Sequence, residues 1–247
     1  MLEHKPNLWI FGDSYCDPDF QNDKSYQGWP QLIKKEYNVT NLSKTGSGPD
    51  YSMQQLVKML KRTKINDRKN IHIFFVISDI FRIPLDFANP SILTHSKESL
   101  IVNYMLFKFF PDTVKNSIEL QKDINKTWTT KQQKKIEQIF RHHILYSSYT
   151  KTEIIKTVLF LKELSFQFAS VYVASVYQHI PDFFGTIDNT KNFYLAKTKI
   201  VDVFDNDFGY GEDPRNNHIP KDSHKKLVEH ISKWTKELQP FEFKDLI

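Results

Sequence analysis

Three short, mostly apolar runs stand out along the chain, at residues 8–11, 71–77 and 171–176. They are rich in β-branched and aromatic residues and do not alternate with polar positions, as is typical of strands buried on both faces of a parallel sheet. Residues 39–42 predict a further strand between the first two. Because helical patterns separate these strands, the sequence predicts an α/β fold with a central parallel sheet.

Apolar residues recur at helical spacing in two segments. The first follows Asp50, which is placed to cap it, and the second opens near Pro220 and closes the chain. The predicted buried faces consist of Met53, Leu56, Val57 and Leu60 in the first helix, and of Leu227, Val228, Ile231, Trp234 and Leu238 in the second.

Residues from about 80 to 150 interrupt this alternation of strands and helices. They are rich in Phe, Tyr and Lys, mostly helical in pattern, and too long for an ordinary connection. We interpret them as a helical insertion in a single domain that spans residues 1–247. Extra core is the first interpretation of the insertion, because aromatic residues at helical spacing usually pack inside. A lid or a dimer surface is the alternative.

The net charge and its distribution narrow the classes of partner that the chain is expected to bind. The chain has 34 Lys and Arg against 29 Asp and Glu, a formal net charge of +5 that is spread through helical segments. Nucleic-acid binding usually has a clustered basic footprint, so we expect a solvated surface and no nucleic-acid partner. The nucleic-acid alternative rests on a pI of about 9.0 and on Lys interleaved with aromatic residues around 104–141.

The single cysteine, Cys16, allows no intramolecular disulfide, and we expect it to be a small buried hydrophobe. Residues 1–6 lack the apolar core of a signal peptide. No apolar run approaches the roughly 18 residues that span a bilayer. We therefore expect a cytoplasmic protein with no signal peptide, no transmembrane segment and no membrane partner.

Two segments have residue types that bind metals, and neither has the spacing that a metal site requires. Residues 205–209 have the acidic character of a calcium loop, but its twelfth position is Asn216, where a calcium loop has Glu. The adjacent His142 and His143 lack a second pair of Cys or His at zinc-binding spacing. We expect no metal and no cofactor.

Candidate chemistry begins directly after the first strand. The segment Gly12-Asp13-Ser14-Tyr15 follows the apolar run, so Ser14 comes just past the carboxyl end of a buried strand. Ligands bind at this edge of an open α/β sheet because the loops there converge on a crevice. A bare Gly-Asp-Ser also fits a plain turn or a helix cap. Two later segments, residues 41–48 and 213–224, favour the functional interpretation.

These three segments resemble, in content and order, the first, second and last blocks of the SGNH/GDSL hydrolase family. The resemblance implies a flavodoxin-like three-layer sandwich of the SGNH hydrolase type. It also implies that Ser14 is the nucleophile and His218 the general base, with backbone N–H groups of Ser14 and Gly46 in the oxyanion hole. Gly46 also fits a plain strand-to-helix turn. His224, six residues after His218, is the alternative base, although a residue inside the closing helix is more often structural.

The last block departs from the family's pattern at the acid that orients the base. Arg215 stands where the family has Asp, three residues before His218. Asp213 is the nearest candidate for the acid, with Glu212 next. A Ser-His dyad is the alternative, because a backbone carbonyl also holds an imidazole, although less effectively.

The third block, residues 76–82, lacks the family's Asn donor to the oxyanion hole. Ser78 is the substitute that we expect, through its hydroxyl or its backbone N–H. Asp79 is the alternative, and it would have to be protonated because a carboxylate repels an oxyanion. Losing one donor lowers the rate about 10²- to 10³-fold, so we expect slow or narrow activity.

The activity that the resemblance implies is hydrolysis of an acyl ester by a Ser-His or Ser-His-Asp site. The expected partner is a small-molecule or glycan ester, and carbohydrate O-acetyl groups are a frequent substrate class in the family. The alternative is an inactive member that binds a glycan or a protein. The Asn-His-x-x-x-x-x-His ending occurs among virus-borne members, and a viral source would place the chain in a host-cell cytoplasm. The sequence carries no signal for an oligomeric state.

Overall fold

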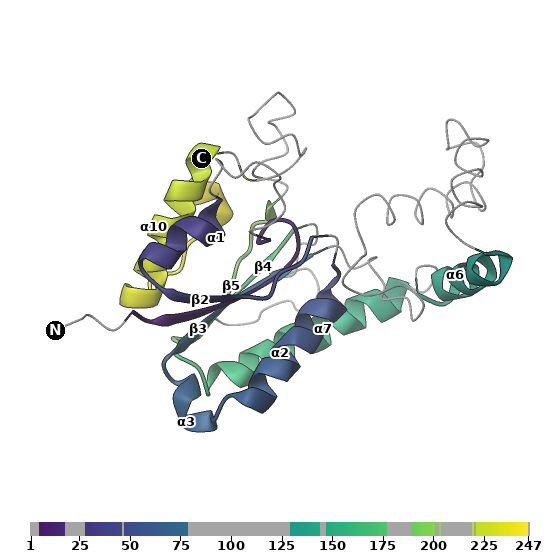
Figure 1. Ribbon diagram of the computed structural model, residues 1–247, viewed down its shortest axis with the longest axis horizontal. Coiled ribbons are helices and arrows are strands. Elements are labelled where there is room, and N and C mark those ends of the chain that lie inside the picture. The colour runs from purple at the N-terminus through teal and green to yellow at the C-terminus, as the bar shows by residue number, and fades with distance from the viewer. Residues whose placement is uncertain are drawn as a thin grey trace.

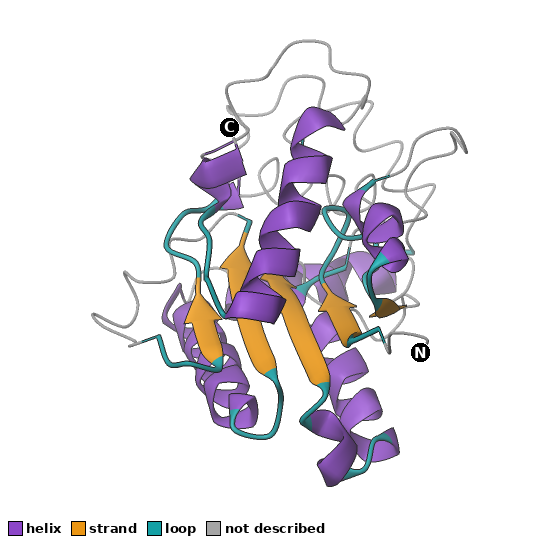
Figure 2. Cartoon of the chain, turned by 90° about the vertical axis from the view of Figure 1, so that its left-hand side faces the viewer, coloured by secondary structure: helices purple, strands orange, loops and turns teal. Residues whose placement is uncertain are grey.

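The structure is a computed structural model that describes residues 5–17, 28–45, 47–78, 129–143, 147–176, 189–200, 203, 219 and 221–246. In this part of the chain, five strands form one parallel sheet in the order β2-β1-β3-β4-β5. The sheet lies between layers of helices (Figure 1, Figure 2). The strands are β1 (Asn7–Phe11), β2 (Asn38–Asn41), β3 (Ile71–Ile77), β4 (Ser170–Ser175) and β5 (Phe193–Leu195). The predicted α/β fold with a central parallel sheet is therefore confirmed.

The four predicted strands lie within one residue of their predicted bounds. β3 is buried along its whole length, because both faces of this central strand are covered. β5 is absent from the sequence-based prediction, since its three residues are too short a run to stand out from the surrounding loops. It pairs with β4 and completes the sheet at that edge.

Helices cover both faces of the sheet (Figure 1). α2 (Pro49–Arg62) and α7 (Ser147–Ser165) pack on one face, and α1 (Trp29–Leu32) and α10 (Lys221–Glu237) pack on the other. This layering and the strand order are consistent with a flavodoxin-like three-layer sandwich. The other described helices are η1 (Ile33–Lys35), α3 (Ile65–Arg68), α6 (Thr130–His143) and η4 (Phe243–Leu246).

Two apolar cores hold the layers together. Neighbouring residues of β3 point to opposite faces, so Phe74 belongs to the core under α10 and Phe75 to the core under α2 and α7. Under α10, Trp234 packs edge-on against Tyr172 of β4 and Phe74, with ring centroids 5.3 Å and 6.5 Å apart. The sheet is therefore anchored on both sides and fixes the starting points of the loops at its carboxyl edge.

Two details of α2 differ from the prediction. The helix begins at Pro49 with Gly48 at the N-cap, so Asp50 is not the cap and lies in the first turn. Pro suits this first position because the N–H that it lacks would have no partner within the helix. Val57, predicted for the buried face, is 38% exposed, whereas Met59 packs against the core. The face of α2 that meets the sheet is thus rotated toward Met59.

The closing helix α10 has the predicted apolar face over most of its length. Leu227, Val228, Ile231 and Trp234 are all buried. Leu238 is the exception, because α10 ends at Glu237 and Leu238 takes a left-handed backbone φ of 53°. A residue in this conformation commonly ends a helix, and its side chain leaves the helical stripe.

The interval predicted as a helical insertion, about 80–150, contains α6 and the start of α7 in the part of the chain that the structure describes. The later turns of α7 pack on the sheet through Ile154, Val158 and Leu161. Residues 79–128 and 144–146 lie outside the described residues.

Among the helices that are described, none is both long and apolar enough to cross a membrane.

His72, at the start of β3, is expected to make stability depend on pH. Its Nδ1 lies 2.7 Å from Ser170 Oγ, and burial lowers the pKa of His72 from 6.5 to about 4. Between these values the unfolded chain binds the proton and the folded chain does not, so the free energy of unfolding falls as the pH falls. The loss is roughly 3 kcal/mol at most, and it is absent above pH 6.5.

The measurement is urea denaturation at pH 7 and at pH 4.5 for the wild type and for His72→Gln, whose amide can still meet Ser170 but does not ionise. Carboxylates that titrate in this range contribute equally to both proteins. We therefore expect a smaller loss of stability in His72→Gln than in the wild type. Equal losses would show that His72 does not couple folding to protons.

Candidate functional site

Ser14 lies on a tight turn at the carboxyl end of β1. The backbone N–H groups of Cys16 and Asp17 both donate to the Asp13 carbonyl oxygen, at 3.0 Å and 2.9 Å, and Asp13 Oδ1 accepts the Tyr15 N–H at 3.2 Å. Asp13 is fully buried and Ser14 is 2% exposed. We call residues 13–17 the serine turn.

The strand order places the serine turn at a switch point of the sheet. The chain runs from β1 outward to β2 and then returns to β3 on the other side of β1. The strand order reverses at such a point, and ligands of open α/β sheets bind in the crevice that forms there, outside the carboxyl ends of the strands. The predicted position of Ser14 just past a strand end is confirmed.

Gly12 allows the serine turn to lie close to the sheet. A Cβ atom at Gly12 would lie 3.0 Å from Cys16 Sγ and 3.1 Å from Val76 Cβ, and both neighbours are buried. The Gly12 carbonyl oxygen also accepts the Lys44 N–H at 3.1 Å and the Ser47 hydroxyl at 3.2 Å. A side chain at this position would therefore displace the turn from the strands and the loop that hold it.

Gly12→Ala is expected to reduce the free energy of unfolding by about 1–3 kcal/mol, the usual range for an overpacked core. Gly28→Ala is the matched control, because a Cβ there would first meet the flexible end of Gln31, at 3.3 Å. We expect a much smaller change in that variant. Urea denaturation of both variants checks this, and similar losses in the two would contradict the close packing at Gly12.

The loop that follows β2 is fastened to the serine turn. Asn41 donates its side-chain amide to the Cys16 carbonyl oxygen at 2.7 Å and accepts the Ser43 N–H at 2.9 Å. Asp17 Oδ2 accepts both the Thr45 N–H at 2.6 Å and the Thr45 hydroxyl at 2.8 Å. Thr45 and Ser47, the two neighbours of the predicted oxyanion residue Gly46, are both anchored, because the Ser47 hydroxyl also donates to the Gly12 carbonyl oxygen. Gly46 itself lies outside the described residues.

Ser78 follows β3 directly and is buried beside the same loop. Its hydroxyl donates to the Ser47 carbonyl oxygen at 2.9 Å. The hydroxyl proton is thus already used within the loop, so an oxyanion role for this residue would fall to its backbone N–H. Asp79, the alternative donor, lies outside the described residues. The structure therefore brings Ser14, the loop after β2 and Ser78 to one edge of the sheet.

The candidate base and acid, His218 and Asp213, lie outside the described residues, as do Glu212 and Arg215. Ile219, next to His218 in the chain, is 3% exposed and belongs to the same hydrophobic cluster as Tyr15 of the serine turn. Ile219 is therefore anchored on the face of the sheet that also receives the serine turn.

His224, the alternative base, lies in the first turns of α10 and is 5% exposed. Its Nδ1 accepts the backbone N–H of Trp29 at 3.1 Å. Because Nδ1 must hold a lone pair to accept this bond, the proton of the neutral ring is on Nε2. A ring in this tautomer has no second lone pair with which to take the Ser14 proton. The geometry thus disfavours His224 as the base.

Cys16 is 1% exposed, as predicted for a small buried hydrophobe. Burial raises the pKa of its thiol well above 9.0, and the nearby Asp13 carboxylate raises it further. The thiolate is the nucleophilic form of cysteine, so a thiol held in its protonated form is a poor competitor for Ser14.

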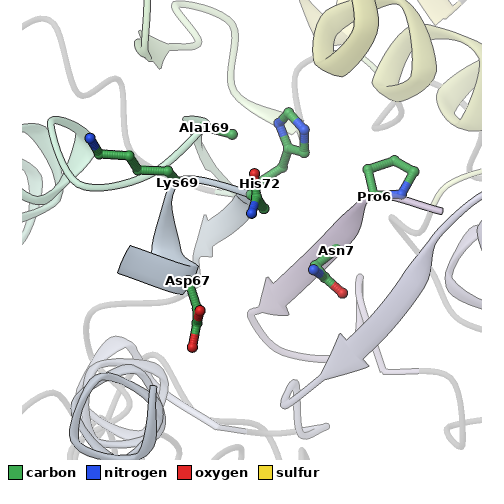
Figure 3. A pocket seen from close by; sticks show the side chains of 7 residues that line it. Pro6, Asn7, Asp67, Lys69, His72 and Ala169 are labelled. Carbon is green, nitrogen blue, oxygen red and sulfur yellow. The ribbon is translucent and has the colours of Figure 1, made fainter. Parts of the chain in front are cut away.

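An open pocket of about 690 Å³ lies at the opposite edge of the sheet (Figure 3). It is lined by Pro6, Asn7, Asp67, Lys69, Asn70, His72 and Ala169. These residues lie at or before the amino ends of β1, β3 and β4, so the length of the strands separates the pocket from Ser14.

Among the described residues, no group of three or more His, Cys, Asp or Glu is arranged to hold a metal.

Sequence-based reasoning missed the residues that fasten the site together, Asp17, Asn41 and Trp29. Asn41 lies within the segment that resembles the second block, but the sequence pattern does not indicate that its side-chain amide would donate a hydrogen bond to the serine turn.

In comparisons with protein-family models, with curated proteins and with solved structures, no match to the chain was found.

Proposed function

We propose that the chain is a serine hydrolase of the SGNH/GDSL type that cleaves an acyl ester. The observation that carries the proposal is the position of Ser14, at the carboxyl end of a central strand and at the switch point of the sheet. The loop after β2 is hydrogen-bonded around the serine turn, as a loop that supplies an oxyanion donor must be.

In the proposed mechanism, His218 takes the proton of the Ser14 hydroxyl while the Ser14 oxygen attacks the ester carbonyl carbon. The negative charge that develops on the carbonyl oxygen is held by the backbone N–H groups of Ser14 and Gly46, with Ser78 as a third donor. The protonated His218 then donates to the leaving alcohol. Water, activated by His218, attacks the acyl-enzyme and releases the acid.

Asp213 is the proposed acid that orients His218, and a Ser-His dyad is the alternative. None of these steps requires a metal or a cofactor. The proposed substrate is a small-molecule or glycan ester, and a carbohydrate O-acetyl group is the form that we would test after simple esters.

A fluorophosphonate probe tests the proposal, because it reacts preferentially with an activated serine and forms a covalent bond to its oxygen. We expect labelling of the wild type that disappears in Ser14→Ala. Cys16→Ala is the matched control, since it removes the neighbouring nucleophile and should keep the label. Absence of labelling in folded wild type would reject the enzyme and favour the alternative, an inactive fold that binds a glycan or a protein. The Ser78 hydroxyl, which donates to Ser47, is the feature that favours this alternative.

A further inference from the structure

The first turns of α10 are tied to the serine turn through one residue, Trp29 of α1. The Trp29 backbone N–H donates to His224 Nδ1 at 3.1 Å, and the indole Nε1–H of the same residue donates to the Tyr15 carbonyl oxygen at 2.9 Å. All three residues are at most 5% exposed. α1 and α10 pack against each other on one face of the sheet (Figure 1).

His224 acts as a capping group for the first turn of α1, because its Nδ1 accepts a backbone N–H of that turn. The first N–H groups of a helix have no partner within the helix, and the N-cap residue here, Gly28, has no side chain to accept them. His224 supplies the acceptor from another helix. A Cβ at Gly28 would lie 3.8 Å from His224 Cε1, so the ring also lies directly over the start of α1.

We propose that His224 is a positioning residue for the reaction at Ser14. Through Trp29 it fixes the start of α10 relative to the turn that carries Ser14. Ile219, two residues before α10, is buried in the same cluster as Tyr15, and the proposed base, His218, is its neighbour in the sequence. This inference rests on the proposed function, because the distance between these two segments matters to chemistry only if Ser14 and His218 react. The two segments come from opposite ends of the chain, so tertiary contacts such as these set their distance.

The acceptor atom at the Nδ1 position is the part of His224 that the proposal requires. Asn can place its Oδ1 close to the position of Nδ1, Gln places its polar atoms farther out, and Phe keeps the ring without an acceptor. The three substitutions therefore separate the hydrogen bond from the packing. His230→Phe is the matched control on the same helix, because His230 is half-buried and its ring lies against Phe241, at 5.3 Å between centroids.

The experiment measures kcat and KM for p-nitrophenyl acetate in these variants, with folding checked by circular dichroism. We expect His224→Phe to lower kcat by about 10- to 100-fold with KM nearly unchanged, because small misplacements of reacting groups reduce the rate by this order. His224→Asn should stay close to wild type, His224→Gln should fall between, and His230→Phe should match wild type. A merely structural role would lower the amount of folded protein and leave kcat per folded molecule unchanged.

Imidazole ¹⁵N chemical shifts provide a readout that does not depend on activity. We expect the neutral His224 ring of the wild type to carry its proton on Nε2. A proton on Nδ1, an unchanged kcat in folded His224→Phe, or an equal loss in the Asn and Phe variants would each overturn the positioning role. If His224→Phe does not fold, the Asn and Gln variants decide. Lack of turnover in a wild type that has the Nε2–H tautomer would instead reject the proposed function.

Discussion

Ser14→Ala is expected to lower kcat/KM for p-nitrophenyl acetate and butyrate by about 10⁴-fold or more, because no other described group replaces the attacking oxygen. His218→Ala is expected to cause a loss of similar size, since an unactivated serine hydroxyl is a weak nucleophile. The double variant should be no slower than either single one, because a nucleophile and its base act as one unit.

Ser52→Ala is the control for the loss of a buried serine hydroxyl. Ser52 is fully buried in α2, and its hydroxyl oxygen has no hydrogen-bond partner among the described residues. We expect this variant to keep full activity. Circular dichroism verifies that each protein is folded. Turnover by folded Ser14→Ala at the wild-type rate would assign the activity to another group or to a contaminant.

Trp234→Ala is expected to reduce the free energy of unfolding by about 3–5 kcal/mol, the range for removal of a large aromatic side chain from a core. The Trp234 side chain is 2% exposed and packs against Tyr172, Phe74 and His72, with centroids 5.3, 6.5 and 6.0 Å away. Its removal leaves a cavity between α10 and the sheet that stiff neighbouring rings cannot fill.

Phe166→Ala provides the comparison for Trp234→Ala, because Phe166 is 66% exposed. Its loss should change the free energy of unfolding by no more than about 0.5 kcal/mol. Guanidinium denaturation followed by circular dichroism measures both variants. A change below about 1 kcal/mol in Trp234→Ala would mean that α10 contributes little to the fold.

Much of the sheet could be predicted from the sequence, because strands buried on both faces leave continuous apolar runs. The run at 71–77 is the clearest example, and it coincides with β3. β5 could not be predicted in this way, since an edge strand of three residues depends on its pairing with β4 and not on its own composition. The cap of α2 was missed because Pro49 and Gly48 set the helix start more strongly than Asp50 does.

The position of Ser14 could be predicted, because it depends on the end of one strong strand. The groups around it depend on contacts between distant parts of the chain, such as Asp17 with Thr45 and Ser78 with Ser47. Spacing in the sequence does not encode such contacts. The tautomer of His224 is a similar case, since it follows from one bond to Trp29.

The described parts of the proposed site come from residues 12–78, whereas the proposed base comes from the last part of the chain. β3 and β4, which pair along six positions, join these two parts in one sheet. Cutting the chain between β3 and β4 would therefore yield one fragment with the nucleophile and another with the base. Neither fragment alone should hydrolyse esters, so activity recovered on mixing would report the reassembly of β3 with β4.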